Sequence, residues 1–175
     1  QLVDCSTSYG NEGCNGGLMD WAFEYAHDHA LCSETDYPYK GRDGTCQNDD
    51  DSLCSDGYQV NSCVDVTIGS KAALQEAVAQ HPVSIGVCAE GLAWQFYFGG
   101  IVRWLCGQCQ DHGVAVVGYG HGGWKTIGDV DYWIVRNSWG SGWGEKGYIR
   151  VQADDSSKGT CGILESPSFP LLTKQ

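Results

Sequence analysis

Ten cysteines in 175 residues are the feature that most limits the folds available to this chain. Reducing compartments rarely keep so many cysteines as disulfides, so the count favours a secreted, vacuolar or lysosomal protein. A cytosolic metal protein would instead need paired C-x-x-C half-sites. Only Cys106-Gly107-Gln108-Cys109 has that spacing, with His112 three residues further on, and a single half-site does not predict a metal. We therefore expect no metal centre.

Charge and hydropathy exclude several classes of partner. The net charge of −12 at pH 7 repels phosphate groups, so neither nucleic acid nor an anionic membrane is expected as a partner. The same charge would suit an acidic compartment, where part of it is neutralised. No stretch approaches the roughly 18 apolar residues that a membrane helix requires, and we expect no signal peptide within these residues. Because the chain begins with Gln1 rather than Met, we expect a processed product or an incomplete sequence.

The two parts of the chain differ in pattern. Residues 1–62 are rich in loops around one amphipathic segment, which predicts a helix from Leu18 to about His29. In residues 63–175, Ser70 is expected to cap a short helix that ends before Pro82. Four strands are then predicted, at 83–87, 114–117, 132–135 and 148–151. No repeat or linker separates the parts, so we expect an α+β protein of two packed subdomains.

A histidine and a later asparagine carry the strongest chemical signal. The chain contains no G-x-S-x-G elbow, P-loop or H-E-x-x-H motif, and no cofactor is expected. His112 precedes a buried apolar run, where a strand can hold its ring toward a cleft. Asn137 ends a predicted strand and can orient an imidazole, and Trp139 could keep water off that bond. The other four histidines are expected in exposed loops or at helix ends.

Eight spaced motifs resemble the papain family of cysteine peptidases, most closely its plant papain and cathepsin L branch. Two of them contain the residues just described, Asp111-His112-Gly113-Val114 and Asn137-Ser138-Trp139-Gly140. The others, in the family's order, are Leu2-Val3-Asp4-Cys5, Gly13-Cys14-Asn15-Gly16-Gly17, Tyr37-Pro38-Tyr39, Gly118-Tyr119-Gly120, Gly147-Tyr148-Ile149-Arg150 and Cys161-Gly162-Ile163. The resemblance covers essentially the whole chain.

The resemblance implies a papain-like fold of two lobes with a cleft between them. Residues 1–62 would form the remainder of a helical lobe, and 63–175 an antiparallel β-barrel lobe whose C-terminal strand packs back toward the first. It also implies an endopeptidase that cleaves peptide or protein substrates through an acyl-enzyme. His112 matches the catalytic base and Asn137 its orienting residue, with Trp139 and Asp111 in support.

Substrate-binding positions and disulfides follow from the same resemblance. The matching substrate-binding residues are Gly16, Gly17, Leu18, Met19, Gly86, Gln110 and Ser166. Gly16 and Gly17 match backbone that pairs with extended substrate, and the others match the pocket for the second residue before the scissile bond. In the family, the position of Gln110 is often apolar and the position of Gly86 usually holds a larger residue. We therefore expect this pocket to be wider and more polar than papain's.

The expected disulfides are Cys5–Cys46 and Cys106–Cys161, with Cys14 lacking a partner in this chain. The pairing of Cys32, Cys54, Cys63, Cys88 and Cys109 stays open, with Cys63–Cys88 as one possibility.

The nucleophilic cysteine is not recognised in this sequence. In the family it lies in a C-G-[SA]-C-[WY] segment about 130–150 residues before the histidine, and counting back from His112 leads upstream of Gln1. One interpretation is a papain-like peptidase whose N-terminal segment is missing or carried on a second chain, so that the helical lobe is incomplete here. The other is a non-catalytic pseudo-peptidase that serves as a binding or structural subunit. His112 and Asn137 favour the first interpretation, and the absent cysteine favours the second.

Overall fold

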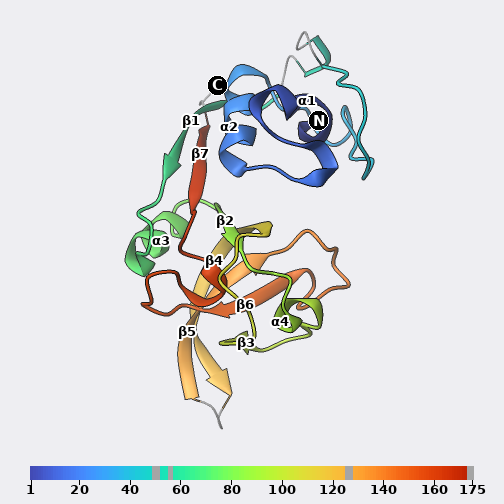
Figure 1. The fold of residues 1–175 in the computed structure, drawn as a ribbon. Helices are drawn as coiled ribbons and strands as arrows, with labels where there is room; N and C mark the ends of the chain where they lie inside the picture. Colours follow the sequence, from blue (N-terminus) through green and yellow to red (C-terminus); the bar gives the residue numbers. More distant parts are fainter. Residues whose placement is uncertain (49–51, 55–56, 125–127, 173–175) are drawn as a thin grey trace. The chain divides into compact units, whose positions relative to one another are not determined.

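The computed structural model describes residues 1–48, 52–54, 57–124 and 128–172. The chain divides into two compact units, one made of residues 1–64 with 170–175 and one of residues 65–169 (Figure 1). The first unit is mainly helical and the second contains most of the strands, so the α+β class is confirmed. Among the described residues, no helix combines the length and apolar character needed to cross a membrane.

Short helices and turns make up most of the first unit. Its elements are α1 (Leu2–Cys5), η1 (Ser6–Tyr9), η2 (Gly13–Asn15), α2 (Met19–Asp28), η3 (Ser52–Cys54) and most of β1 (Val60–Asp65). The predicted helix is confirmed as α2, which buries Tyr25 and Ala26. Gln1 ties this helix to the loop after it, because its side-chain amide donates to the Tyr25 hydroxyl and to the Ala30 carbonyl, each at 2.9 Å.

A mixed sheet organises the second unit. Its elements are α3 (Lys71–Val78), β2 (Val83–Val87), α4 (Leu92–Gln95), β3 (Ile101–Val102), β4 (His112–Trp124), β5 (Gly128–Arg136), β6 (Tyr148–Gln152), η4 (Thr160–Gly162) and the start of β7 (Ser168–Leu172). From β7 the hydrogen-bonded strand order is β7-β2-β4-β5-β6-β3. The pairs are antiparallel apart from β3 and β6, which run parallel.

Alternating apolar residues of the strands build the core of this unit. The four predicted strands are confirmed as β2, β4, β5 and β6, and α3 covers part of their core with Leu74 and Val78. The cap of α3 is also confirmed, since the Ser70 hydroxyl oxygen accepts from the Ala73 N–H at 3.1 Å. This frame fixes the strand ends that carry His112 and Asn137.

Strand β4 is longer than predicted. The prediction covered residues 114–117, whereas the strand runs to Trp124, with a register shift between Val116 and Gly118. His121, expected in an exposed glycine-rich turn, therefore lies on a strand, although its side chain is exposed. The nearby glycine has a packing role, because a side chain at Gly120 would collide with the Tyr132 ring on β5.

Four disulfides join described residues of the chain: Cys5–Cys46, Cys32–Cys54, Cys88–Cys109 and Cys106–Cys161. Both pairs implied by the resemblance are present. The possible pair Cys63–Cys88 is wrong, because Cys88 is bonded to Cys109, and their Cα atoms lie 4.6 Å apart. The antiparallel pairing of β2 with β4 brings these two cysteines together just beyond Val87 and just before His112. Both cysteines of the C-x-x-C motif are thus held in disulfides.

An ion pair between Glu145 and Arg150 closes the turn that leads into β6. The carboxylate accepts from Arg150 Nε at 2.8 Å, from Arg150 Nη2 at 2.6 Å and from the Gly100 N–H at 3.2 Å. The hydrogen bonds from Arg150 lower the pKa of Glu145 below its ordinary value. We predict that Glu145→Gln lowers the free energy of unfolding by about 1 kcal/mol at neutral pH, a modest loss because both side chains are partly exposed.

The pH dependence of this loss follows from the sign of the shift. A carboxyl whose folded-state pKa is depressed stabilises the fold fully above its ordinary pKa, and the contribution is lost as the pH falls through the folded-state value. Urea unfolding of the native protein and of Glu145→Gln should therefore differ most near neutral pH and converge in acid. The exposed Glu76→Gln on α3 is the control. A difference that grew in acid would contradict this account.

Candidate active site

Strand pairing places His112 and Asn137 at the same end of the sheet. The β2–β4 register pairs Val87 with His112, so His112 is the first residue of β4. In the antiparallel β4–β5 pair, Ala115 lies opposite Arg136. The start of β4 therefore meets the end of β5, and Asn137 directly follows that end.

A backbone group fixes the geometry of the hydrogen bond between these two side chains. His112 Nε2 lies 2.8 Å from Asn137 Oδ1, and the Ser138 N–H donates to the same oxygen at 2.7 Å. Because a backbone N–H can only donate, the atom facing it must be the amide oxygen, and Nε2 must carry the proton that it shares. In the neutral imidazole, Nδ1 is then the nitrogen that can accept a proton. The expected contact is present.

Three tryptophans surround the pair. The Trp139 ring lies 5.2 Å from the His112 ring, centroid to centroid, at an interplanar angle of 32°. The buried Trp94 meets the His112 ring edge-on at 6.3 Å, and Trp143 stacks on Trp94 at 6.1 Å and donates its indole N–H to the Trp94 carbonyl. The rings of Trp94 and Trp139 thus both contact the His112 ring, and Trp143 packs against Trp94. The sequence analysis found Trp139 but missed Trp94 and Trp143.

The Asp111 carboxylate contacts backbone N–H groups after β2. Its carboxylate oxygens accept from the Ala89 N–H at 2.7 Å and from the Glu90 N–H at 3.2 Å. Its own N–H donates to the Val87 carbonyl at 3.1 Å. Asp111, which directly precedes His112, therefore ties the start of β4 to the end of β2 and to the loop that follows it.

Gln110, Gly86 and Ser166 lie together in the second unit. The Ser166 hydroxyl donates to Gln110 Oε1 at 2.8 Å, and Gln110 Nε2 donates to the Gly162 carbonyl at 3.1 Å. A side chain at Gly86 would collide with the Gln110 amide. The amide of Gln110 thus stands over the bare backbone of Gly86, and this surface is polar.

The remaining predicted substrate-binding residues belong to the first unit. Gly16 has a φ of +120°, a backbone conformation that favours glycine, and its carbonyl accepts from the Glu12 N–H at 2.9 Å. The Leu18 N–H donates to Asn11 Oδ1 at 3.0 Å, and a side chain at Gly17 would collide with that same amide. Leu18 is exposed, and Met19 begins α2. Asn11 therefore shapes this loop, which is a role that the sequence analysis missed.

Cys14 is a free, exposed thiol with the wrong electrostatics for a nucleophile. Desolvation and a hydrogen bond with the Asp43 carboxylate raise the pKa of Cys14 above its ordinary value. Reactive cysteines have a lowered pKa, because the thiolate is the attacking species. Cys14 was expected to lack a disulfide partner in this chain, and among the described residues it forms no disulfide.

One cluster has the composition of a metal site. The sulfurs of Cys88 and Cys109 and carboxylate oxygens of Glu90 and Asp111 all lie within 4.8 Å of one another. The two sulfurs are joined in a disulfide, so they offer no thiolate to a metal.

Comparison with known sequences decides the family. The model of papain family cysteine proteases matches residues 1–171. The chain belongs to the papain family of cysteine proteases. The thiol protease SEN102 of Hemerocallis sp. is 47% identical to it over 174 residues, which are 99% of this chain and 46% of that protein. The cysteine proteinase RD21A of Arabidopsis thaliana is 49% identical over 173 residues, which are 98% of this chain and 36% of that protein. The chain spans half the length, or less, of these curated relatives.

Solved structures of papain-like proteases share the fold. The Amb a 11 cysteine protease, a ragweed pollen allergen solved in its proform, has a TM-score of 0.87 at 38% identity, covering 99% of this chain and 46% of that chain. The bromelain protease of Ananas comosus, in complex with the E64 inhibitor, has a TM-score of 0.86 at 33% identity, covering 98% of this chain and 76% of that chain. The papain-like fold implied by the sequence motifs is confirmed.

Proposed function

We propose that the protein is a cysteine endopeptidase in which His112 is the catalytic base and Asn137 orients it. The observation that carries the proposal is the 2.8 Å bond between His112 Nε2 and Asn137 Oδ1, with the amide fixed by the Ser138 N–H. That arrangement leaves Nδ1 to take a proton from a thiol. The resulting thiolate attacks the peptide carbonyl, His112 passes the proton to the leaving amine, and water hydrolyses the thioester.

The nucleophilic thiol is proposed to come from outside residues 1–175, from a preceding segment or a second chain. Eight of the ten cysteines are held in disulfides, and the pKa of Cys14 is raised rather than lowered. The tenth, Cys63, lies on strand β1 rather than at the start of a helix, where the helix dipole would lower its pKa. The greater length of the matched relatives supports this source. The substrate is a peptide or protein whose extended backbone pairs with Gly16 and Gly17. Asp111 supports the base by holding the loop in front of it, and Trp139 shields its bond to Asn137.

Product masses test this function. The intact protein, incubated with an unstructured polypeptide in an acidic buffer, should release fragments cut at internal bonds. A thiol-directed epoxide should stop their release. Removal of single residues from the ends, or release that the epoxide does not affect, would contradict a cysteine endopeptidase.

A second candidate, a non-catalytic binding or structural subunit, is favoured by the raised pKa of Cys14 and by the eight cysteines held in disulfides. Such a subunit would bind peptide without releasing fragments.

The location is also part of the proposal. The disulfides and the net charge of −12 support a secreted or vacuolar (lysosomal) protein.

Gln110 is proposed to make the pocket for the second residue before the scissile bond polar. An apolar substrate side chain placed there would leave the Gln110 amide and the Ser166 hydroxyl without some of their water contacts. We predict that Gln110→Leu raises kcat/KM about 10-fold for peptides with Leu at that position, relative to peptides with Gln there. Paired reporter peptides measure the ratio. The exposed Gln80→Leu is the matched control, and an unchanged ratio in Gln110→Leu would contradict the assignment.

A further inference from the structure

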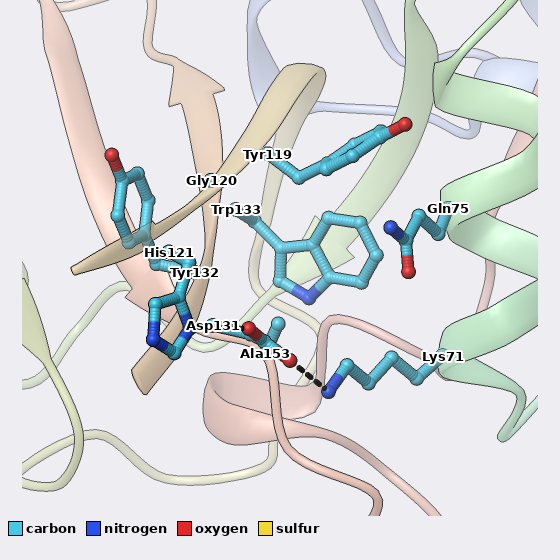
Figure 2. Close-up of a pocket in the computed structure, with 9 residues that line it drawn as sticks. All are labelled: Lys71, Gln75, Tyr119, Gly120, His121, Asp131, Tyr132, Trp133 and Ala153. Carbon is cyan, nitrogen blue, oxygen red and sulfur yellow. Dashed lines mark hydrogen bonds and ion pairs between the residues drawn. The ribbon is translucent and has the colours of Figure 1, made fainter. Parts of the chain in front are cut away.

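A cavity of about 290 Å³ lies in the second unit, between α3 and the β4–β5 hairpin (Figure 2). The strand register builds it, because Tyr119 lies opposite Trp133 and His121 lies opposite Asp131. Residues two apart on a strand point to the same face, so these four side chains share one face of the hairpin. From α3, Lys71 and Gln75 are four residues apart, on one face of the helix, and close the other side. The cavity is at the small end of the range for small-molecule sites.

Asp131 lies at one wall of the cavity between two hydrogen-bond partners. Its Oδ2 accepts from Lys71 Nζ at 2.8 Å and its Oδ1 lies 2.8 Å from His121 Nδ1. These hydrogen bonds lower the pKa of Asp131, and the bond to Asp131 raises the pKa of Lys71. The carboxylate therefore stays charged, while the Lys71 ammonium keeps N–H groups beyond the one that Asp131 accepts.

The indole N–H of Trp133 is the feature that indicates a bound ligand. Trp133 is 1% exposed, and among the described residues its Nε1 has no hydrogen-bond acceptor. Figure 2 shows the indole nitrogen turned toward the Lys71–Asp131 pair, with the Tyr119 ring beside the indole. A buried donor without an acceptor is costly, so the site favours a bound molecule that offers an oxygen.

The charges around the cavity favour a neutral molecule over an anion. Asp131 lines the wall, Asp155 lies 4.0 Å from Lys71, and the chain as a whole carries −12. Hydroxyl groups can accept from Lys71, Gln75 and Trp133 and can also donate to Asp131. The exposed Tyr119 ring offers apolar surface to C–H groups.

We propose that this cavity binds a neutral polyhydroxylated ring, either a free monosaccharide or one sugar of a longer glycan. The Trp133 N–H donates to a ring hydroxyl, Lys71 and Asp131 contact neighbouring hydroxyls, and Tyr119 packs against the ring. The site is independent of peptide hydrolysis, so the proposed peptidase function and this site can fail separately.

Titration of the ¹⁵N-labelled intact protein with glucose tests the proposal. The chain has seven tryptophans, and Trp133→Phe identifies the indole N–H resonance of Trp133. That resonance should shift saturably, with a dissociation constant on the order of millimolar for a ligand of about a dozen non-hydrogen atoms. The other indole resonances should stay in place. If cellobiose binds at least about 10-fold more tightly than glucose, the ligand is a longer glycan. If the two sugars bind equally, the ligand is a single ring.

Variants and a charged sugar make the test specific. Gln75→Ala should weaken glucose binding about 5-fold through the lost amide contact, whereas Gln80→Ala, just beyond α3, should not. Glucuronate should bind more weakly than glucose, because its carboxylate meets Asp131 and Asp155. The proposal is overturned if the Trp133 resonance does not respond to glucose at about 100 mM. Tighter binding of glucuronate, or equal weakening by the two glutamine variants, would also overturn it.

Discussion

His112→Ala should lower kcat/KM for peptide hydrolysis by about 10³- to 10⁴-fold. The substitution removes both the acceptor of the thiol proton and the donor to the leaving amine, and each role contributes to the barrier. The fold should persist, because the ring is partly exposed and its loss removes the hydrogen bond to Asn137 without opening a buried cavity. Initial rates with a fluorogenic peptide, at enzyme concentrations matched by circular dichroism, measure the effect.

His81→Ala is the matched control for this prediction. His81 lies in the same unit, just beyond α3, where its ring stacks on Phe169 at 4.8 Å. Its loss should leave kcat/KM within about 2-fold of the native value, since it contacts none of the residues assigned to catalysis. Retention of more than about a tenth of native activity by His112→Ala would show that another group is the base.

The double variant Cys106→Ala/Cys161→Ala should lower the free energy of unfolding by about 4 kcal/mol. The disulfide joins positions 55 residues apart, and the chain-entropy estimate for a loop of that length gives this value. Cys161 is buried within η4, and its carbonyl accepts from the Cys88 N–H at 2.9 Å, so the loss would also loosen the end of β2. Alanine is chosen because serine would bury an unpaired hydroxyl.

Urea unfolding of the oxidised proteins measures this loss. The exposed Ser157→Ala, in the same connection before η4, should change the free energy by less than about 0.5 kcal/mol. A loss below about 1 kcal/mol in the double variant would mean that the bridge contributes little to the stability of this unit.

The helices and strands that could be predicted from sequence are those whose formation depends on the residues of their own segment. The Ser70 cap and the apolar face after it define α3 without reference to the rest of the chain. Strand β2 likewise follows from the alternation of apolar side chains in its sequence, since Val83, Ile85 and Val87 are all buried in the core. The short strand β3 and the one-turn helix α4 carry too few residues for a period to be visible, and pairing with β6 is what makes β3 a strand.

The residues of the candidate site also fall into two groups, those marked by a contiguous motif and those brought into place by contacts distant in sequence. His112, Asn137 and Trp139 could be located from sequence because their motifs are contiguous and resemble those of a family. Trp94 was missed because its contact with the His112 ring depends on the path of the chain after β2. The Cys88–Cys109 bridge was missed for a similar reason, since strand pairing rather than spacing brings the two sulfurs together. Long-range pairing was predictable only where the resemblance supplied it.

The most direct measurement is the rate at which a thiol-directed epoxide labels the intact protein. Mass spectrometry follows the labelling of the native protein and of the His112→Ala variant. The account predicts one added epoxide per native molecule, with loss of peptidase activity in proportion to labelling and with the label on a cysteine outside residues 1–175. It also predicts that His112→Ala is labelled at least about 100-fold more slowly, because His112 generates the thiolate. Equal labelling rates in the two proteins, or no labelling of a native protein that still cleaves peptides, would contradict the assignment of His112 and Asn137 as the catalytic pair of a cysteine peptidase.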